Sequence, residues 1–135
     1  MYTNNYVLSR DQENMAGYLR PSALDDALTA LDAAAYVIVA GGTDYYPARV
    51  GRPLDDDVLD VTDLAGLRDI TETPDYWRFG ALVTWTDIIR ADLPPLFDGL
   101  KLAAREVGGP QVQNAGTLAG NICNASPAAD GMPNL

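Results

Sequence analysis

Histidine is missing from this 135-residue sequence altogether. Histidine is the most frequent general base and metal ligand in proteins, and it activates the nucleophile in Ser-His and Cys-His catalytic sites. Its absence excludes both kinds of nucleophilic site from this chain. We therefore expect no acid–base or nucleophilic catalysis by the side chains of this chain.

Cysteine and positive charge are also scarce. The single cysteine, Cys123, cannot form an internal disulfide, and it cannot hold zinc or an iron–sulfur cluster without further ligands, so we expect it to be a small packed residue. Nine Lys and Arg residues stand against 19 Asp and Glu residues, which gives a net charge of -10. Nucleic acids and anionic membrane surfaces are bound through Lys and Arg, so this balance argues against both kinds of partner.

Long apolar runs and targeting segments are missing as well. The longest apolar run covers residues 33–40, whereas a transmembrane helix needs about 20 apolar residues. The first residues of the chain lack the basic and apolar regions of a signal peptide. These features predict no membrane span and a cytoplasmic location.

The first half of the chain predicts a helix followed by a buried strand. Ser22 and Asp25 suit a helix start, and the helix is expected to run to about Ala35. The residues expected to share its buried face are Leu24, Leu28 and Leu31. Residues 36–40, with the sequence YVIVA, are apolar and rich in β-branched side chains, which predicts a buried strand.

Shorter elements are expected in the second half. Strands are predicted at residues 58–61, 67–71 and 76–83, and Thr73-Pro74-Asp75 suits a hairpin turn between the last two. Helices are predicted at residues 86–90 and 95–107. The longer helix is expected to bury Leu96, Leu100 and either Ala103 or Ala104. The order of elements indicates a mixed α and β fold.

Ala40-Gly41-Gly42-Thr43-Asp44 directly follows the predicted buried strand. Two glycines at a strand end permit positive φ and a close approach of ligand, and the N–H groups of Gly42, Thr43 and Asp44 could form an anion-binding nest. Because cations are few, a phosphate ligand would have to be held mainly by such backbone dipoles. Taken alone, Gly-Gly after a strand is more often a plain turn, and the segment matches neither a Rossmann fingerprint nor a P-loop.

Residues 108–135 are the second candidate for ligand binding. They consist of small residues and amides with almost no charge and no helical or strand period, so we expect a loop that cradles a phosphate-rich ligand. Leu118 and Ile122 are expected to anchor this loop while Thr117, Gly120 and Asn121 face the ligand. A flexible surface loop is the alternative. The chain ends within this segment, so we expect the protein to be incomplete.

In order and spacing, the two loops resemble the FAD-binding domain of the molybdenum hydroxylases, which include xanthine dehydrogenase and carbon monoxide dehydrogenase. The resemblance runs from about Tyr18 to Leu135. The segments that carry it are residues 19–22, 40–44, 60–64, 80–84 and 111–130. It implies an α+β, two-subdomain FAD-binding fold of the carbon monoxide dehydrogenase flavoprotein (PCMH) type, truncated in its second subdomain. The implied subdomains are residues 1–57 and 58–135.

The resemblance also implies FAD as the cofactor, with no catalytic side chain and no metal ligand. The loop at residues 40–44 would bind the FAD pyrophosphate, and the second loop would wrap the same cofactor. The residues implied to line the cofactor are Ala40, Gly41, Gly42, Thr43, Asp44, Thr117, Gly120, Asn121, Ser126 and Asp130.

The function implied by the resemblance is that of a FAD-binding oxidoreductase subunit. An iron–sulfur subunit would pass electrons from a molybdopterin subunit to FAD, and FAD would hand them to an acceptor such as NAD or a quinone. The present chain alone is expected to be inactive. A flavin-free interaction module of the same fold is the main alternative. A flavin oxidase of the vanillyl-alcohol type is a weaker one, and the Ala-Ser-Pro-Ala-Ala-Asp segment at residues 125–130 speaks against it.

Two positions depart from the family pattern. Gln113 stands where arginine is common, which removes a positive charge near the pyrophosphate and is expected to weaken binding. Ala119 replaces the first glycine of a usual Gly-Gly pair, and its methyl group is expected to be tolerated where φ is negative. Arg49 is a candidate for the missing charge, although a solvated arginine is the favoured interpretation.

Three other features favour ordinary structural roles. The acidic run at residues 55–57 is interpreted as a solvated surface rather than a cation site. Trp77 and Trp85 are interpreted as core or edge packing rather than as platforms for a flavin or adenine ring.

Overall fold

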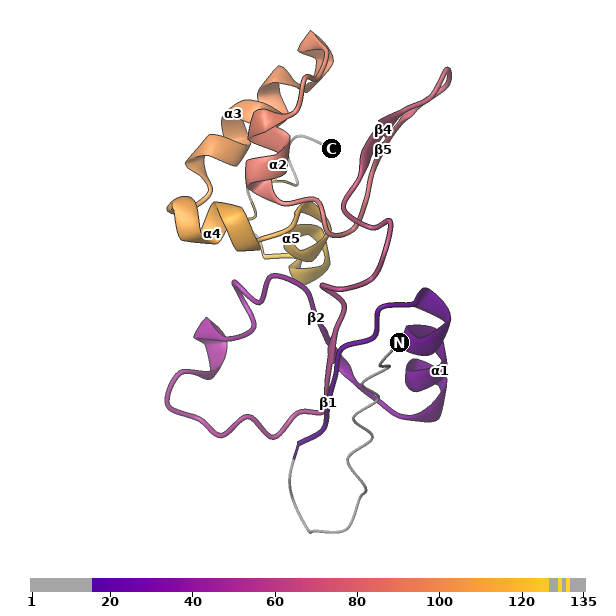
Figure 1. The fold of residues 1–135 in the computed structure, drawn as a ribbon. Coiled ribbons are helices and arrows are strands. Elements are labelled where there is room, and N and C mark those ends of the chain that lie inside the picture. Colours follow the sequence, from indigo (N-terminus) through magenta and orange to yellow (C-terminus); the bar gives the residue numbers. More distant parts are fainter. Residues whose placement is uncertain (1–15, 127–128, 130, 132–135) are drawn as a thin grey trace.

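The computed structural model describes residues 16–126, 129 and 131, and Figure 1 shows how its helices and strands are arranged. The strands are β1 (Tyr18–Leu19), β2 (Val37–Val39), β3 (Val58–Asp60), β4 (Ile70–Glu72) and β5 (Trp77–Phe79). The α-helices are α1 (Leu24–Ala33), α2 (Trp85–Arg90), α3 (Asp98–Glu106), α4 (Pro110–Ala115) and α5 (Leu118–Asn124). Two short 3-10 helices are η1 (Pro47–Arg49) and η2 (Pro95–Phe97). The presence of both kinds of element confirms the expected mixed α+β fold.

A three-stranded parallel sheet forms the first half of the structure. Its strand order is β1-β3-β2, and Val58 lies opposite both Tyr18 and Val37. Helix α1 connects β1 to β2, while the η1 segment extends on the other side of the sheet (Figure 1). Every residue of the central strand is buried, and Leu59 is fully inaccessible. The expected boundary between residues 57 and 58 falls just before β3. Strand β3 pairs with β1 and β2, which belong to the first half. The division into two subdomains remains a proposal.

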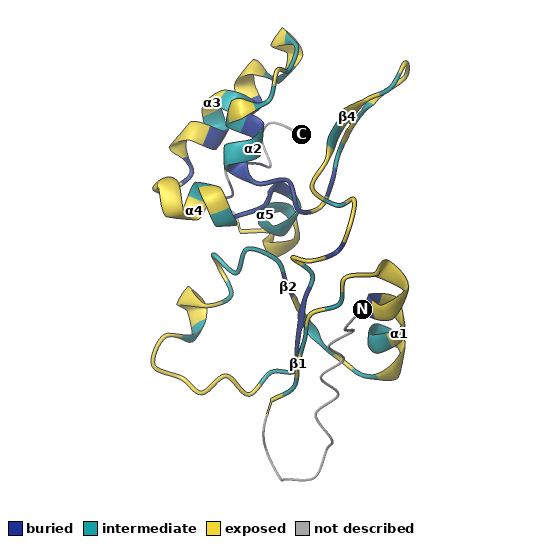
Figure 2. Ribbon diagram, in the orientation of Figure 1, coloured by how far each residue is buried: buried dark blue, intermediate teal, exposed yellow. Residues whose placement is uncertain are grey.

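Helix α1 begins later and buries a different face than expected. Its N-cap is Ala23, with no side-chain cap, so Ser22 does not start the helix. The buried residue is Ala27, and Ala30 and Leu31 pack beside it. Leu24 and Leu28 are about half exposed, and Figure 2 shows that much of α1 is exposed. The helix is apolar on two overlapping faces, and the small alanines allow the closer approach to the sheet.

Strand β2 confirms the strand expected after this helix, but it is buried on one side only. Val39 is buried, whereas Ile38 is 57% exposed. Strand β2 lies at the edge of the sheet, and α1 leaves the face that carries Ile38 partly uncovered. The apolar run at residues 36–40 is therefore not buried on both faces.

An antiparallel hairpin made of β4 and β5 begins the second half. Ile70 pairs with Phe79, and the turn at Thr73 is closed by its N–H, which donates to the carbonyl of Tyr76 at 2.9 Å. The hairpin predicted around Thr73-Pro74-Asp75 is therefore correct. Trp77 and Phe79 both make edge-to-face contacts with Phe97. These contacts tie the hairpin to the helices, and they confirm edge packing as the role of Trp77.

A second core lies among the helices that follow the hairpin. Its buried members are Val83, Trp85, Ile88, Leu100, Ala104, Val107 and Leu118. The full burial of Trp85 confirms its expected core role. Leu96, expected in this core, is 83% exposed, because residues 95–97 form the separate turn η2 and the helical period begins only at α3.

Helix α2 begins at Trp85, one residue before the expected start, and Thr84 is its N-cap. The Thr84 hydroxyl accepts from the Asp87 N–H, and the Asp87 carboxylate accepts from the Thr84 N–H at 2.9 Å. This reciprocal pair is a capping box, which satisfies two otherwise unpaired donors of the helix start. Arg68 adds two hydrogen bonds to the same carboxylate, at 2.9 and 3.2 Å.

The expectation of an irregular loop over residues 108–135 is wrong for much of the described part. Helix α4 starts with Pro110 at a position where proline fits, and α5 is capped by Thr117, whose hydroxyl accepts from the Gly120 N–H at 3.0 Å. Both helices are short and rich in residues of low helix propensity. The helix caps and the burial of Leu118 stabilise them. Neither produces a repeating apolar pattern, so helical periodicity in the sequence did not predict these helices.

The capping box of α2 predicts a specific loss of stability in acid. Burial alone would raise the pKa of Asp87, but hydrogen bonds from Arg68 and Thr84 outweigh it and hold the pKa below its ordinary value of 3.8. The stabilisation is therefore fully present above that value and is lost as the pH falls through the lower, folded pKa. We expect Asp87→Asn to lower the free energy of unfolding at neutral pH by about 1 kcal/mol.

Urea unfolding of the wild type and Asp87→Asn between about pH 7 and pH 2 measures this effect. The difference between the two proteins should shrink towards acid. Glu72→Gln is the matched control, because it removes one negative charge from an exposed strand position. A gap that stays constant with pH would contradict the role assigned to the ionised Asp87.

Candidate functional site

The first loop leaves the carboxyl end of β2 and turns at once into a short helical segment. Gly42 has a φ of 67°, which confirms the expected positive φ. The carbonyl of Gly42 accepts from the Tyr46 N–H at 3.1 Å, so a helical turn follows it. The backbone N–H groups of Gly42, Thr43 and Asp44 donate to no other group in the described part of the chain. Three consecutive donors are therefore available at this turn.

The second loop is attached to the start of α2 by backbone pairing. The Trp85 N–H donates to the Gly116 carbonyl at 3.2 Å, and the Leu118 N–H donates to the Val83 carbonyl at 3.0 Å. These bonds flank an antiparallel bridge between Thr84 and Thr117. The connection between α4 and α5 is thereby held against the second core.

The two loops meet, although more than seventy residues separate them in the sequence. A Cβ atom on Gly41 would lie 1.8 Å from the carbonyl oxygen of Ala115, and one on Gly116 would lie 3.2 Å from the Thr43 hydroxyl. Only glycine allows the backbones to approach so closely at Gly41. In Figure 1, α4 and α5 lie at the end of β2 from which the first loop departs. The structure thus brings together the two segments selected from the sequence.

The second loop uses many of its polar groups internally. The Leu118, Gly120 and Asn121 N–H groups all donate within the chain, whereas those of Thr117 and Ala119 have no acceptor in the described residues. Leu118 is buried and Ile122 packs against the same core, which confirms their expected anchoring role. The Thr117 hydroxyl, expected to face a ligand, serves as the cap of α5.

The remaining predicted site residues lie at the end of the described chain. Asn121 accepts through its Oδ1 from the Gly131 N–H at 3.2 Å. The carbonyl of Ser126 accepts from the Ala129 N–H at 2.9 Å, and Ser126 is an exposed residue. Asp130 lies outside the described residues.

The two departures from the family pattern have clear surroundings. The Gln113 side chain donates through Nε2 to the Arg105 carbonyl at 3.1 Å, so it covers the carboxyl end of α3. It does not extend towards the first loop. Ala119 lies within α5, where an L residue adopts its ordinary negative φ. The extra methyl group is compatible with this helix, as expected.

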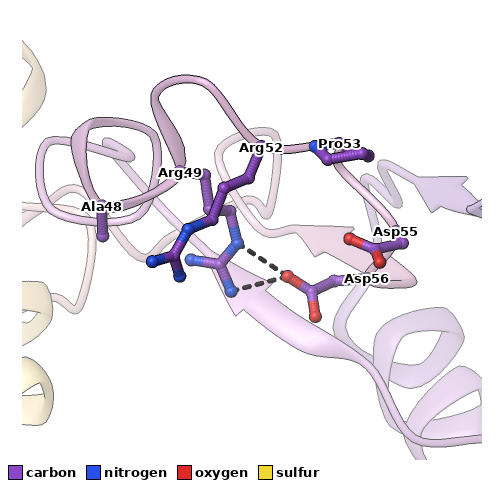
Figure 3. A pocket seen from close by; sticks show the side chains of 6 residues that line it. All are labelled: Ala48, Arg49, Arg52, Pro53, Asp55 and Asp56. Atoms are coloured by element: carbon purple, nitrogen blue, oxygen red, sulfur yellow. Dashed lines mark hydrogen bonds and ion pairs between the residues drawn. The ribbon is translucent and has the colours of Figure 1, made fainter.

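The Arg49 side chain is partly buried, and neighbouring groups hold it. Its Nη2 lies 2.6 Å from Asp56 Oδ2, and its guanidinium stacks over the Tyr45 ring at 3.7 Å. Figure 3 shows this ion pair in an open hollow. The lining residues are Ala48, Arg49, Arg52, Pro53, Asp55 and Asp56. Arg49 therefore differs from the fully solvated side chain that the sequence favoured, because Asp56 and Tyr45 hold it and about a quarter of its side chain, 28%, stays exposed.

Two residues of the acidic run at 55–57 accept hydrogen bonds or form ion pairs with other parts of the chain. Asp56 pairs with Arg49, and Asp57 accepts from the Gly17 N–H at 2.6 Å. Within the described residues, no three potential metal ligands form a cluster. Two carboxylates of the run therefore hold the long loop and the start of β1 in place.

Asp60, a buried carboxylate whose role was not predicted from the sequence, fixes the strand ends beside the first loop. Asp60, which pairs with Val39 in the sheet, accepts from the Thr62 N–H at 2.8 Å and from the Tyr18 hydroxyl. Burial would raise the pKa of Asp60, but these hydrogen bonds and the charge of Arg20 outweigh it and lower the pKa. Burial and the bond to Asp60 raise the pKa of Tyr18 to about 12. The sequence feature that could have predicted this role is an aspartate at a strand end with a threonine two residues later, because an aspartate side chain often accepts from the backbone N–H two residues on.

Two further expectations have definite outcomes. Cys123 lies exposed on α5, so its interpretation as a packed residue is wrong. Across the part of the chain that the structure describes, every helix is too short or too polar to cross a bilayer.

Comparison with known proteins identifies a family. Residues 12–135 match the family model described as the FAD binding domain in molybdopterin dehydrogenase. The chain is 34% identical over 126 residues to the xanthine dehydrogenase FAD-binding subunit of Escherichia coli O157:H7, an alignment that covers 87% of this chain and 41% of that protein. It is 31% identical over 120 residues to the nicotine 6-hydroxylase medium subunit of Paenarthrobacter nicotinovorans, covering 84% and 41%.

A solved structure agrees with this assignment. Carbon monoxide dehydrogenase from Hydrogenophaga pseudoflava matches with a TM-score of 0.73 and 26% identity, over 86% of this chain and 42% of that chain. The present chain therefore spans about two fifths of the length of these relatives. The two loops, their contact and these similarities lead to one conclusion: the chain belongs to the family of FAD-binding domains of the molybdopterin dehydrogenases.

Proposed function

We propose that this chain binds FAD and holds its pyrophosphate at the first loop. The observation that carries the proposal is the set of three consecutive free N–H donors, at Gly42, Thr43 and Asp44, beside the close contact of Gly41 with Ala115. Backbone donors at the start of a helical turn are suited to phosphate oxygens. A chain with a net charge of -10 gains from a site that needs no cation.

The residues present fit such a ligand, and each has a distinct part in the proposed site. Ala40 and Gly41 bring the backbone of the first loop against the second, while Gly42, Thr43 and Asp44 offer their N–H groups. In the second loop, Thr117, Gly120, Asn121, Ser126 and Asp130 are proposed to lie along the cofactor. Bound FAD supplies the redox chemistry; the residues of this chain bind it, orient it and exclude water.

We further propose that the chain serves as the flavin-binding part of a molybdenum-containing hydroxylase in the cytoplasm. An iron–sulfur subunit and a molybdopterin subunit would be its partners, and NAD or a quinone would be the electron acceptor. The relatives with which it aligns are themselves designated FAD-binding or medium subunits. The absence of histidine is compatible with this division of labour, because substrate chemistry would reside on another subunit.

A flavin-free interaction module is the second candidate. It is favoured by Gln113, which places no positive charge near the first loop and turns to the end of α3 instead. The absorption spectrum of the purified native polypeptide decides between the two. Oxidised flavin absorption at one equivalent per chain supports the FAD-binding function, and its absence after incubation with FAD supports the module.

Separation of the two loops should disrupt the site. Gly41→Ala places a methyl group within 1.8 Å of the Ala115 oxygen, so one loop must move. We expect this overpacking to cost about 1–3 kcal/mol of stability and to reduce FAD affinity by about tenfold or more, measured by fluorescence titration of the native polypeptide. Gly109→Ala is the matched control, because its new methyl group would meet only Gln111 Oε1 at the ordinary distance of 3.5 Å. Equal FAD affinity in the two variants would contradict the assignment.

Removal of one backbone donor provides a separate test. Thr43 is the first residue of the helical turn after Gly42, a position at which proline is tolerated. Thr43→Pro removes the N–H and the hydroxyl, whereas Thr43→Ala removes the hydroxyl alone. A charge-assisted hydrogen bond is worth about 1.5–3 kcal/mol, so the proline variant should bind FAD at least about tenfold more weakly than the alanine variant. Indistinguishable dissociation constants would show that this N–H does not contact a phosphate.

A further inference from the structure

The aromatic ring of Tyr46 lies directly on Gly42, the residue at which the first loop turns. A Cβ atom on Gly42 would overlap Cε2 and Cδ2 of this ring and would lie 3.6 Å from its Cζ. The Tyr46 N–H also donates to the Gly42 carbonyl at 3.1 Å. Backbone and side chain of Tyr46 therefore both contact Gly42, and the ring fills the space that a side chain at position 42 would need.

Gly42 is a position that gains from such a contact. Its φ of 67° lies in the left-handed region, which glycine adopts without strain but exchanges readily for other conformations. The conformation at Gly42 sets the direction of the three N–H donors at residues 42–44. Glycine alone does not hold that direction, whereas a ring packed against its Cα restricts the alternatives.

Tyr46 is itself held by its neighbour Tyr45. The two rings meet edge to face, with centroids 5.1 Å apart. The Tyr45 hydroxyl donates to Asp56 at 3.2 Å, and the Arg49 guanidinium stacks on the Tyr45 ring at 3.7 Å. Arg49 and Asp56 form the ion pair drawn in Figure 3. A continuous set of contacts thus runs from this ion pair through the two rings to Gly42.

Tyr46 contributes little to the two cores. It is 47% exposed, and the described members of either core do not include it. Its replacement therefore leaves the apolar packing of both halves in place. The contact of Tyr46 with Gly42 connects it to the anion-binding turn instead.

We propose that Tyr46 is a positioning residue, whose ring holds Gly42 so that the N–H groups of residues 42–44 stay directed at one anion. The proposal rests on the FAD-binding function proposed above for the same loop. Donors that are already aligned bind without the cost of ordering the turn, so loss of the ring lowers affinity even though Tyr46 donates nothing to the ligand.

The contact itself is tested without FAD, by NMR of the native polypeptide in its apo form. Nuclear Overhauser effects between the Tyr46 ring protons and the Gly42 Hα protons are expected in the wild type. Tyr46→Phe should keep the ring-current shift of the Gly42 Hα protons, and Tyr46→Ala should remove it. Tyr76→Ala, which removes an exposed tyrosine at the hairpin turn, is the matched control and should leave this shift unchanged. Absence of the Overhauser effects in the wild type would overturn the proposal.

The effect on the cofactor site is measured by FAD titration of the same proteins. Tyr46→Ala should bind FAD about fivefold more weakly or worse, whereas Tyr46→Phe and Tyr76→Ala should bind it as the wild type does. A loss in Tyr46→Phe as large as that in Tyr46→Ala would show that the hydroxyl, rather than the ring, is responsible and would overturn the proposal.

A double-mutant cycle separates positioning from direct contact with FAD. Thr43→Pro removes one of the donors and stiffens the turn, whereas Thr43→Ala keeps the donor. If Tyr46 acts through the turn, Tyr46→Ala should weaken binding less in the Thr43→Pro protein than in the Thr43→Ala protein. Equal losses in the two proteins would show that Tyr46 acts independently of the turn, which contradicts the positioning role.

The two proposals fail in different ways. If the wild-type polypeptide binds no FAD, the proposed function is wrong, and the NMR experiment still determines whether Tyr46 holds Gly42. If the wild type binds FAD and Tyr46→Ala binds it equally well, the FAD-binding function stands and the positioning role is wrong.

Discussion

The arrangement of the site depends on one close backbone contact, between Gly41 and the carbonyl of Ala115. A side chain at Gly41 would overlap this oxygen, as the 1.8 Å separation from a hypothetical Cβ shows. The contact joins the carboxyl end of the parallel sheet to the connection between α4 and α5. Two segments that are unremarkable as separate turns therefore become a single surface with several N–H donors that have no acceptor among the described residues.

Each side of this contact is supported by bonds that involve other parts of the chain. On the sheet side, Asp60 links β1 and β3 through Tyr18 and lies beside Val39 in the strand pairing. On the helical side, the bridge between Thr84 and Thr117 holds the second loop against α2. The first support uses a carboxylate and the second uses backbone hydrogen bonds, so both stabilise the surface without contributing a catalytic group.

The sequence predicted well those features that arise from local chemistry. The strand after residue 36, the hairpin turn at Thr73 and the positive φ of Gly42 follow from β-branched side chains, turn residues and glycine. Predictions failed where tertiary packing decides: Leu24 and Leu28 are exposed because Ala27 fits closer to the sheet. Likewise, α4 and α5 depend on caps and on the burial of Leu118, and the partner of Gly41 could not be known before the loops were placed in space.

No positively charged side chain is directed at the first loop by the two residues considered for that role, Arg49 and Gln113. Arg49 is held by Asp56 and Tyr45, and Gln113 covers the end of α3, so neither offers a charge to the first loop. Beside the Gly41 contact lie the Thr43 hydroxyl and backbone N–H groups, which carry no net charge, and the fold sets the direction of the N–H groups. Recognition of an anion by such groups depends on the position of the backbone, and packing between the loops therefore has a greater influence on binding than any single side chain.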